Sequence, residues 1–291
     1  MDGSRQGIID AIEHEADLKK KYLNSQIGCL DKGFVRLVDF MGSDASVVQA
    51  ARVSTNKGTT DKKRDEMLIR YLMRMRHTSP FEQVEFKFHC KLPIFCARQM
   101  VRHRTASLNE MSGRYSQMPE EYYIPEIDRL RTQDKVNLQG SGEEQIEEAT
   151  WIQDSFKDEC KLSFENYNSY LKCGLAREIA RINLPLSTYT QWYWKMDLHN
   201  LFHFLALRLH PHAQYEMRQY AKAIFALIQP IVPVSCQAFA EYKLNARTFS
   251  GKEMNIIKGL LNKIHPNDIS TMLCDSGLSK QEQEELLDKI T

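Results

Sequence analysis

Residues 102–116 bring together side chains that can bind an anion and read polar groups. The segment contains three arginines, a histidine, three serines, an asparagine, a glutamate and one glycine. Arginine keeps its charge at neutral pH, and its planar fork suits phosphate or carboxylate. Ser112 and Gly113 let backbone N–H groups approach an anion closely, and Asn109 and Glu110 can read a donor or acceptor edge. This composition predicts a pocket for a phosphorylated small molecule.

The simpler interpretation of a basic run is a solvated surface or a contact with nucleic acid. Here small polar residues and Glu110 interrupt the arginines, which a groove that tracks a phosphate backbone would not favour. The whole chain has 39 Lys and Arg against 38 Asp and Glu, so it offers nucleic acid no basic field. The sequence favours a discrete anion site and no nucleic-acid partner, with an RNA-binding module as a rival.

A second group of functional side chains lies at residues 197–212, which contain four of the nine histidines. At about 100° per residue, a helix here has an apolar stripe, which comprises Leu198, Leu201, Phe202, Leu205 and Leu209. His199, His203 and His210 lie on one flank of the stripe, and Asp197 and Arg208 lie on the other. Such a helix should face two surroundings, which predicts an oligomer interface with sites on both sides.

Histidines four residues apart on a helix also fit a metal site. The alternative function is therefore a metal-dependent nucleotide hydrolase, with ligands from His199, His203, His210 and His212. A helical zinc site of this kind places a glutamate beside a histidine, whereas residues 200 and 204 are Asn and Phe. The sequence favours no bound metal.

The chain has 291 residues, 42% of them hydrophobic and 26% charged, as in an ordinary globular protein. No apolar run reaches the ~20 residues that span a bilayer, and the charged first residues predict neither a secretory signal nor a membrane anchor. Seven cysteines stand without a CxxC pair, which predicts reduced thiols and a cytoplasmic location. A P-loop, a GxGxxG turn after a strand and a GxSxG elbow are all missing from the sequence, so any dinucleotide is held by side chains.

Hydrophobic periodicity predicts which elements position these groups. Strands are expected at 34–40 and 84–90, and the motif at 102–116 is expected to begin on the end of a helix opened by Pro93 and to continue into a loop. Further helices are expected at 1–24, 48–52 (followed by a polar turn at 54–58), 61–76, 143–181, 198–209 and 215–227, with one more in the tail after the capping box Ser279–Glu282. The predicted fold class is α+β, mostly helical with a small, largely antiparallel sheet.

The predicted organisation is one domain between two extensions. Residues 1–30 form a polar N-terminal extension, 31–245 form the domain, and 246–291 form a helical C-terminal tail. Within the domain, residues 118–150 are polar and contain close glycines, which predicts a surface excursion.

The motif resembles that of the flavin-dependent thymidylate synthases. The family signature is RHR, seven residues, then Ser, and here Arg102-His103-Arg104 is followed at that spacing by Ser112. The wider pattern RHRxxSxNExSxR also matches at every fixed position. The resemblance extends from about residue 48 to 242, and residues 77–82, 176–181 and 197–220 also look like the family.

The resemblance implies a homotetramer with FAD at subunit interfaces and dUMP as substrate. Reduced FAD would mediate transfer of a methylene group from methylenetetrahydrofolate to C5 of dUMP, and a flavin hydride would complete the methyl group of dTMP. NADPH would regenerate the reduced flavin. The cofactor would supply the redox chemistry, while the protein orients the partners and sets the charge around them.

The resemblance also assigns residues. Arg208 is similar to the arginine that promotes ionisation at N3 of the uracil, a catalytic role. Substrate contacts would come from Gln99, Met100, Val101, Arg102, Glu110, Met111, Ser112, Gly113, Arg114, Arg181 and Arg208. Flavin contacts would come from His77, Ser79, Arg102, His103, Arg104, Glu110, Asp197, Leu198, His199 and His203. Asp197 and His203 stand where some relatives carry asparagine. Taken alone, Arg177 and Arg181 would form a surface ion pair with Glu178 or its neighbours. Ser112 has no adjacent base, so its expected role is binding.

Overall fold

The computed structural model describes residues 2–53, 62–136, 138–263 and 266–290. Contacts divide the chain into two units, Met1–Leu244 and Asn245–Thr291. The polar turn predicted at 54–58 lies outside the described residues. The larger unit combines helices with a small antiparallel sheet, so the predicted α+β class is confirmed.

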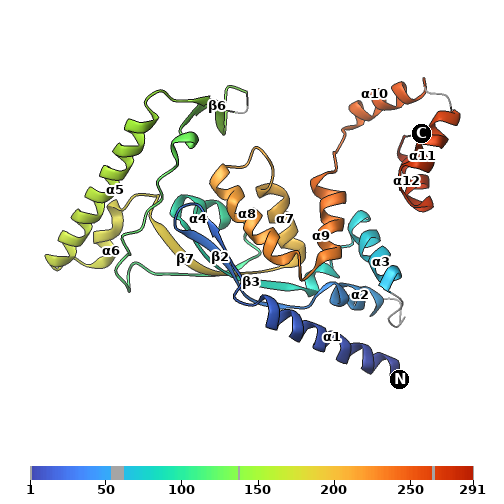
Figure 1. The fold of residues 1–291 in the computed structure, drawn as a ribbon, viewed down its shortest axis with the longest axis horizontal. Coiled ribbons are helices and arrows are strands. Elements are labelled where there is room, and N and C mark those ends of the chain that lie inside the picture. The colour runs from blue at the N-terminus through green and yellow to red at the C-terminus, as the bar shows by residue number, and fades with distance from the viewer. Residues whose placement is uncertain (1, 54–61, 137, 264–265, 291) are drawn as a thin grey trace. The chain divides into compact units, whose positions relative to one another are not determined.

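A five-stranded antiparallel sheet runs through the larger unit (Figure 1). Its order is β1-β2-β3-β7-β4. The bounds are Gln26–Cys29 for β1, Gly33–Met41 for β2, Glu85–Pro93 for β3, Ser107–Glu110 for β4 and Tyr189–Asp197 for β7. β2 and β3 confirm the strands predicted at 34–40 and 84–90. Phe86, Phe88 and Cys90 are fully buried, as their alternation with polar residues predicted.

The predicted strands do not include β7, which pairs with β3 on one side and β4 on the other. Thr190, Trp192, Trp194 and Met196 are buried, while the residues between them are more exposed. This alternation of aromatic and polar residues is typical of a half-buried strand. The signal was therefore present in the sequence, directly before the helix that carries the histidines.

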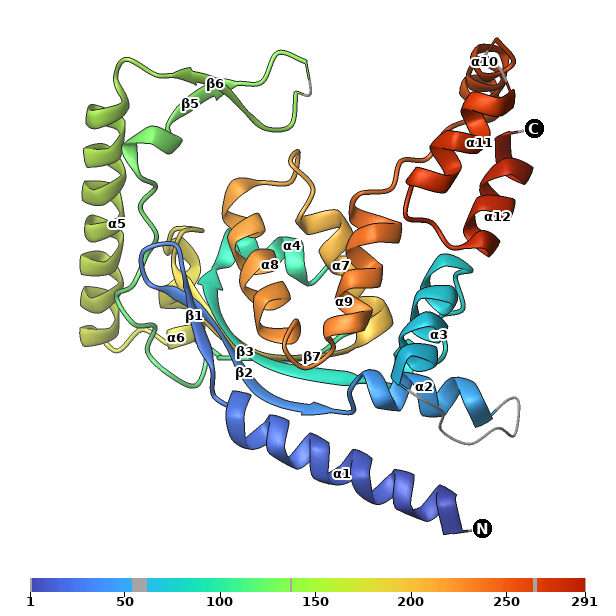
Figure 2. The ribbon, with the colours of Figure 1, turned by 45° about the vertical axis from the view of Figure 1, so that its right-hand side comes forward.

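Helices α4 (Ile94–Met100), α7 (Leu198–Arg208) and α8 (Tyr215–Ile228) lie on one side of the sheet (Figure 2). α7 and α8 confirm the predicted helices at 198–209 and 215–227. The predicted stripe of α7 is buried from Leu198 to Leu205, and Phe204 is buried as well. Pro93 caps α4 at its N-terminus. The helix ends at Met100 and is therefore shorter than predicted, and Arg102 lies in the turn that follows.

The N-terminal helix α1 (Asp2–Tyr22) lies beside β2 (Figure 2). The Gly42 N–H donates to the Glu15 carboxylate at 2.9 Å, and Lys19 lies 3.1 Å from the Asp39 carboxylate. Because β1 also pairs with β2, residues 1–30 are in contact with the sheet. A domain boundary at residue 30 stays a prediction.

Three further helical elements precede β3. They are α2 (Asp44–Val53), α3 (Lys62–Arg74) and the single-turn η1 (Phe81–Gln83). α2 confirms the helix predicted at 48–52, and α3 ends before Pro80 as the sequence predicted. A short helix α9 (Pro233–Phe239) packs against α3, and one π-helical turn, η4 (Ala240–Leu244), follows it.

Residues 118–150 contain both packed and open structure. Met118 and Tyr123 are buried, whereas the hairpin of β5 (Arg131–Gln133) and β6 (Ser141–Gln145) has no buried residue among its described positions. The single turn η2 (Ile127–Arg129) precedes the hairpin. The helix predicted from residue 143 begins later, as α5 (Ala149–Lys172), because β6 occupies the intervening residues. α6 (Arg177–Ala180) and η3 (Arg181–Asn183) complete this region.

The smaller unit consists of α10 (Gly251–Leu261), α11 (Pro266–Asp275) and α12 (Lys280–Ile290), where the sequence predicted one helix. The predicted capping box is confirmed, since the Glu282 N–H donates to Ser279 Oγ at 3.3 Å and the Ser279 N–H donates to the Glu282 carboxylate at 3.0 Å. Among the helices that the described residues form, none has the length and apolar character of a membrane span.

Candidate functional site

The motif at 102–116 contains a strand where a loop was predicted. Ser107–Glu110 forms β4, which pairs with residues 192–195 of β7 at the edge of the sheet. The prediction failed because a four-residue strand depends on its distant pairing partner, and β7 was not recognised. All four residues of β4 are exposed, and Glu110 Oε1 accepts a hydrogen bond from Thr190 Oγ1 at 2.6 Å.

Before β4, the chain places two arginines in solvent. Arg102 and Arg104 are both exposed, and neither forms an ion pair within the described part of the chain. Exposed guanidinium groups without a carboxylate partner keep all their donors available for an anionic ligand.

Arg208, at the end of α7, is held by groups from α4 and from the turn after it. Its Nε donates to His103 Nε2 at 3.2 Å, one terminal nitrogen donates to the Gln99 backbone carbonyl at 3.2 Å, and the other lies 3.5 Å from Gln99 Oε1. No carboxylate pairs with Arg208 among the described residues. This structure therefore orients a partly buried positive charge without neutralising it.

His103 is the neutral partner in this group. Burial and, to a smaller extent, the nearby charges of Arg208 and His203 together lower its pKa to about 4. At neutral pH its Nε2 therefore carries a lone pair that accepts the Arg208 N–H. Burial also lowers the pKa of Arg208.

A second group surrounds Gly113. A Cβ atom at this position would come within 2.9 Å of Met118 Sδ and 3.1 Å of Arg181 Cδ, so a larger residue here would push these two side chains away from the backbone. Arg114 pairs with Glu178, with Nε 3.0 Å from Oε2, and Ser112 Oγ accepts the Arg114 N–H at 3.2 Å. Glu178 therefore pairs with Arg114, and no ion pair joins Glu178 to Arg181 among the described residues.

A third group lines a cavity of about 150 Å³, named here the histidine pocket. Its basic side chains are Arg76, His77, His199, His203 and Lys243, and its other lining residues are Leu72, Met73, Thr78, Phe81, Phe202, Ala206 and Phe239. The Phe202 and Phe239 rings stack at 4.4 Å. No carboxylate is among these described lining residues. Apolar walls with a basic rim fit a planar heteroaromatic group that carries negative charge, as a flavin nucleotide does.

The three groups are partly connected. His103 lies 6.2 Å from His203 between ring centroids, which joins the Arg208 group to the histidine pocket. No hydrogen bond or ion pair joins either of them to the Gly113 group among the residues that the structure describes. The predicted substrate residues are thus divided within one chain.

Several residues that the sequence predicted to contact substrate or flavin have side chains that are buried or already hydrogen-bonded within the protein. Met100 and Leu198 are fully buried, so their side chains belong to the core. The Asp197 carboxylate caps α7, accepting the Asn200 N–H at 3.0 Å and its side-chain amide at 2.6 Å. Val101, Ser79 and Met111 lie at or near the surface, and the Met111 N–H donates to the Gln191 carbonyl at 2.9 Å.

The four histidines of the hydrolase alternative do not converge. His199 and His203 line the histidine pocket, whereas the rings of His210 and His212 contact each other at 5.0 Å. Within the described ranges, no cluster of three or more His, Cys, Asp or Glu side chains is arranged to hold a metal. The hydrolase alternative is unsupported.

Residues that the sequence did not single out complete two of these groups. Gln214, which precedes α8, forms a hydrogen bond to the Gln99 side chain through its Oε1. Arg76 and Lys243 belong to the histidine pocket, and no motif marks them. Each depends on contacts between distant parts of the chain.

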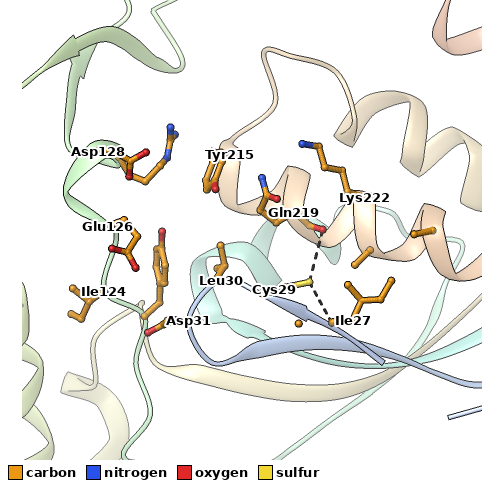
Figure 3. Close-up of a pocket in the computed structure, with 15 residues that line it drawn as sticks. Ile27, Cys29, Leu30, Asp31, Ile124, Glu126, Asp128, Tyr215, Gln219 and Lys222 are labelled. Carbon is orange, nitrogen blue, oxygen red and sulfur yellow. Dashed lines mark hydrogen bonds between the residues drawn. The ribbon is translucent and has the colours of Figure 1, made fainter. Parts of the chain in front are cut away.

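A separate cavity of about 440 Å³ lies between β1, residues 123–129 and α8 (Figure 3). Asp31, Glu126 and Asp128 lie on its rim with Arg129 and Lys222, so charges of both signs face it. None of the predicted site residues lines this cavity.

Known proteins resemble the chain over most of its length. A family model described as thymidylate synthase complementing protein matches residues 36–234. A flavin-dependent thymidylate synthase from Ehrlichia ruminantium (strain Gardel) is 51% identical over 260 residues, covering 89% of this chain and 86% of the relative. A protein of the same name from Treponema denticola is 45% identical over 270 residues, covering 92% and 98%.

The fold of the chain is also similar to that of a solved structure. The crystal structure of a UMP/dUMP methylase from Streptomyces cacaoi, bound with 5-Br dUMP, has a TM-score of 0.68 and 37% sequence identity and covers 75% of this chain and 99% of its own. The chain therefore belongs to the flavin-dependent thymidylate synthase family and is an enzyme of this methyltransferase type.

Proposed function

We propose that the chain converts dUMP to dTMP by reductive methylation, with methylenetetrahydrofolate as carbon donor, FAD as cofactor and NADPH as reductant. The observation that carries this proposal is Arg208, a partly buried cation oriented by His103 and Gln99 and not neutralised by a carboxylate. A fixed charge that needs no reorganisation is an effective way to stabilise developing negative charge. The proposed role of Arg208 is to favour loss of the uracil N3 proton, which makes C5 more nucleophilic.

The other side chains bind and orient the reactants in this proposal. Arg114 and Arg181 bind the nucleotide phosphate beside Gly113, while Gln99 and Glu110 read polar edges of dUMP. Ser112 binds and does not act as a nucleophile, because its Oγ accepts the Arg114 N–H and no base is hydrogen-bonded to it among the described residues. When bound, the flavin supplies the hydride and redox chemistry that no side chain of this chain can supply.

We further propose that the working form is a homotetramer with sites at subunit interfaces. The division of the predicted dUMP residues between two groups supports this, since a neighbouring subunit could supply the missing half. Apolar side chains are also exposed on β4 and β7 and on the segment before β7; they are Leu108, Tyr193, Ile182 and Leu186. Exposed apolar residues of this kind mark interaction surfaces when they are contiguous.

An absorbance spectrum of the purified protein tests the proposal most directly. Flavin bands that bleach on addition of NADPH are expected, followed by dTMP formation when dUMP and methylenetetrahydrofolate are added. Light scattering should give four times the mass of one chain. A colourless protein with stoichiometric metal, or one that binds flavin without forming dTMP, would overturn the proposed function.

The depressed pKa of His103 predicts a pH-dependent stability. The ordinary pKa is 6.5 and the folded value is about 4, so the unfolded chain binds the proton more tightly. The contribution of His103 to the free energy of unfolding is therefore complete above pH 6.5 and is lost as the pH falls toward 4. Urea unfolding should show a smaller loss of stability between neutral and acidic pH for His103→Gln than for the wild type. The same loss in both proteins would contradict the neutral, buried histidine.

Gln214 is predicted to position Gln99 for substrate binding. Gln214→Ala removes the acceptor of the Gln99 side-chain amide, which lets the amide rotate away from Arg208. A hydrogen bond of this kind is worth about 0.5–1.5 kcal/mol, so the KM for dUMP should rise about threefold to tenfold with kcat nearly unchanged. Gln214→Glu retains an acceptor oxygen and should restore the KM. Equal kinetics for the two variants would remove Gln214 from this role.

A further inference from the structure

The histidine pocket carries basic groups for which the function proposed above has no use. We infer that Arg76 and Lys243 form an anion subsite at the rim of this pocket that binds a phosphate group of the flavin nucleotide. The inference rests on the proposed function, because it assigns the ligand as the flavin.

The charge of the pocket is the first argument. All five ionisable side chains that line it are basic, and the described lining includes no carboxylate. Neither Arg76 nor Lys243 forms an ion pair with a described residue. Burial lowers the pKa of Lys243, and the charge of Arg76 lowers it further, so the two cations affect each other. Like charges that face one space repel each other until an anion lies between them.

The backbone places both cations next to the ends of helices that line the pocket. Arg76 follows α3 with φ of 61°, in the left-handed region that favours glycine. The His77 N–H donates to the Leu72 carbonyl at 2.9 Å, and the Arg76 N–H donates to the Met73 carbonyl at 3.3 Å, a Schellman-type helix end. Lys243 lies in the π-helical turn η4, next to α9. Helices usually have glycine at this position. The presence of Arg76 there indicates that its side chain has a function.

The walls determine the class of ligand. Phe81 and the stacked Phe202–Phe239 pair contribute to the apolar lining, whereas the charges lie at Arg76 and Lys243. A ligand that matches has a planar ring and a separate anionic group. The volume of about 150 Å³ is below the ~300 Å³ of sites that enclose a whole ligand, so the pocket holds part of a larger molecule. A flavin with its phosphate at the rim meets these conditions.

Flavins that differ only in phosphate provide the test. Apo-protein prepared by removing the cofactor is titrated with riboflavin, FMN and FAD, and binding is followed by flavin fluorescence. Arg76→Gln and Lys243→Gln should each weaken FMN and FAD binding about tenfold, the value of one charge-assisted contact, and change riboflavin binding less than about twofold. Lys222→Gln, which removes an exposed lysine at the other cavity, is the matched control and should bind all three flavins like the wild type.

Arg76→Gly separates loss of charge from loss of folding. Glycine relieves the left-handed backbone, so this variant should melt at a higher temperature than the wild type while it binds FAD more weakly. Unchanged FAD binding, an equal loss for riboflavin, or an effect only on the KM of methylenetetrahydrofolate or NADPH would overturn the subsite. A wild-type protein that binds no flavin would overturn the proposed function together with the subsite, so the two failures are distinguishable.

Discussion

Arg208→Ala is expected to reduce dTMP formation by a factor of about 10²–10³, the usual cost of removing one preorganised charge at a reacting centre. The loss should appear mainly in kcat, because the charge acts on the uracil as N3 loses its proton. Bound FAD should remain, since the proposed flavin contacts come from other residues. Single-turnover dTMP formation and the flavin absorbance measure the two effects separately.

Two further measurements make this prediction specific. Arg208→Lys keeps a positive charge but lacks the fork that contacts both His103 and Gln99, so it should recover only part of the rate. Guanidinium ion added to the alanine variant should restore activity in proportion to its concentration, which a merely structural defect would not allow. Activity of the alanine variant close to wild type would remove Arg208 from the proposed chemistry.

Hydrophobic periodicity predicted those helices and strands in which the pattern of buried residues can be read from the segment itself. β3 and α7 were recognised because their apolar residues recur with the period of a strand and of a helix. β4 could not be recognised in the same way, since its four exposed residues become a strand only through their pairing with β7. β7 was missed although its alternation is clear, and that omission led to the wrong loop prediction.

In the candidate site too, some residues could be predicted from the sequence, whereas others depend on contacts between distant parts of the chain. Its motif residues could be chosen from spacing and resemblance, and the structure brings His77, His199 and His203 to one pocket. The neutral state of His103 could not be predicted, because it depends on burial and on a cation 105 positions along the chain. Gln214 and Lys243 carry no local signal either, since Gln214 contacts Gln99 on α4 and the pocket around Lys243 is lined by residues from distant parts of the chain.

Arg114→Ala is expected to weaken dUMP binding by about 1.5–3 kcal/mol, or roughly 10- to 100-fold, because it removes a charge-assisted contact to the phosphate. In the free protein Arg114 pairs with Glu178, and both side chains are about half exposed, at 57% and 49%. An exposed pair of this kind is worth only about 0–1 kcal/mol, so a phosphate dianion can displace the carboxylate at little cost. Equilibrium titration with dUMP measures the effect.

Glu178→Gln and deoxyuridine separate phosphate binding from any change in the fold. Glu178→Gln leaves Arg114 without its competing carboxylate, so dUMP affinity should stay equal or increase, opposite to the effect of Arg114→Ala. Deoxyuridine has no phosphate and should bind equally to the wild type and to Arg114→Ala. If Arg114→Ala weakened both ligands alike, the Arg114 side chain would act by ordering this segment through its ion pair with Glu178 and not by binding the phosphate. Unchanged dUMP affinity would instead show that Glu178 is its main partner throughout and that Arg181 binds the phosphate without it.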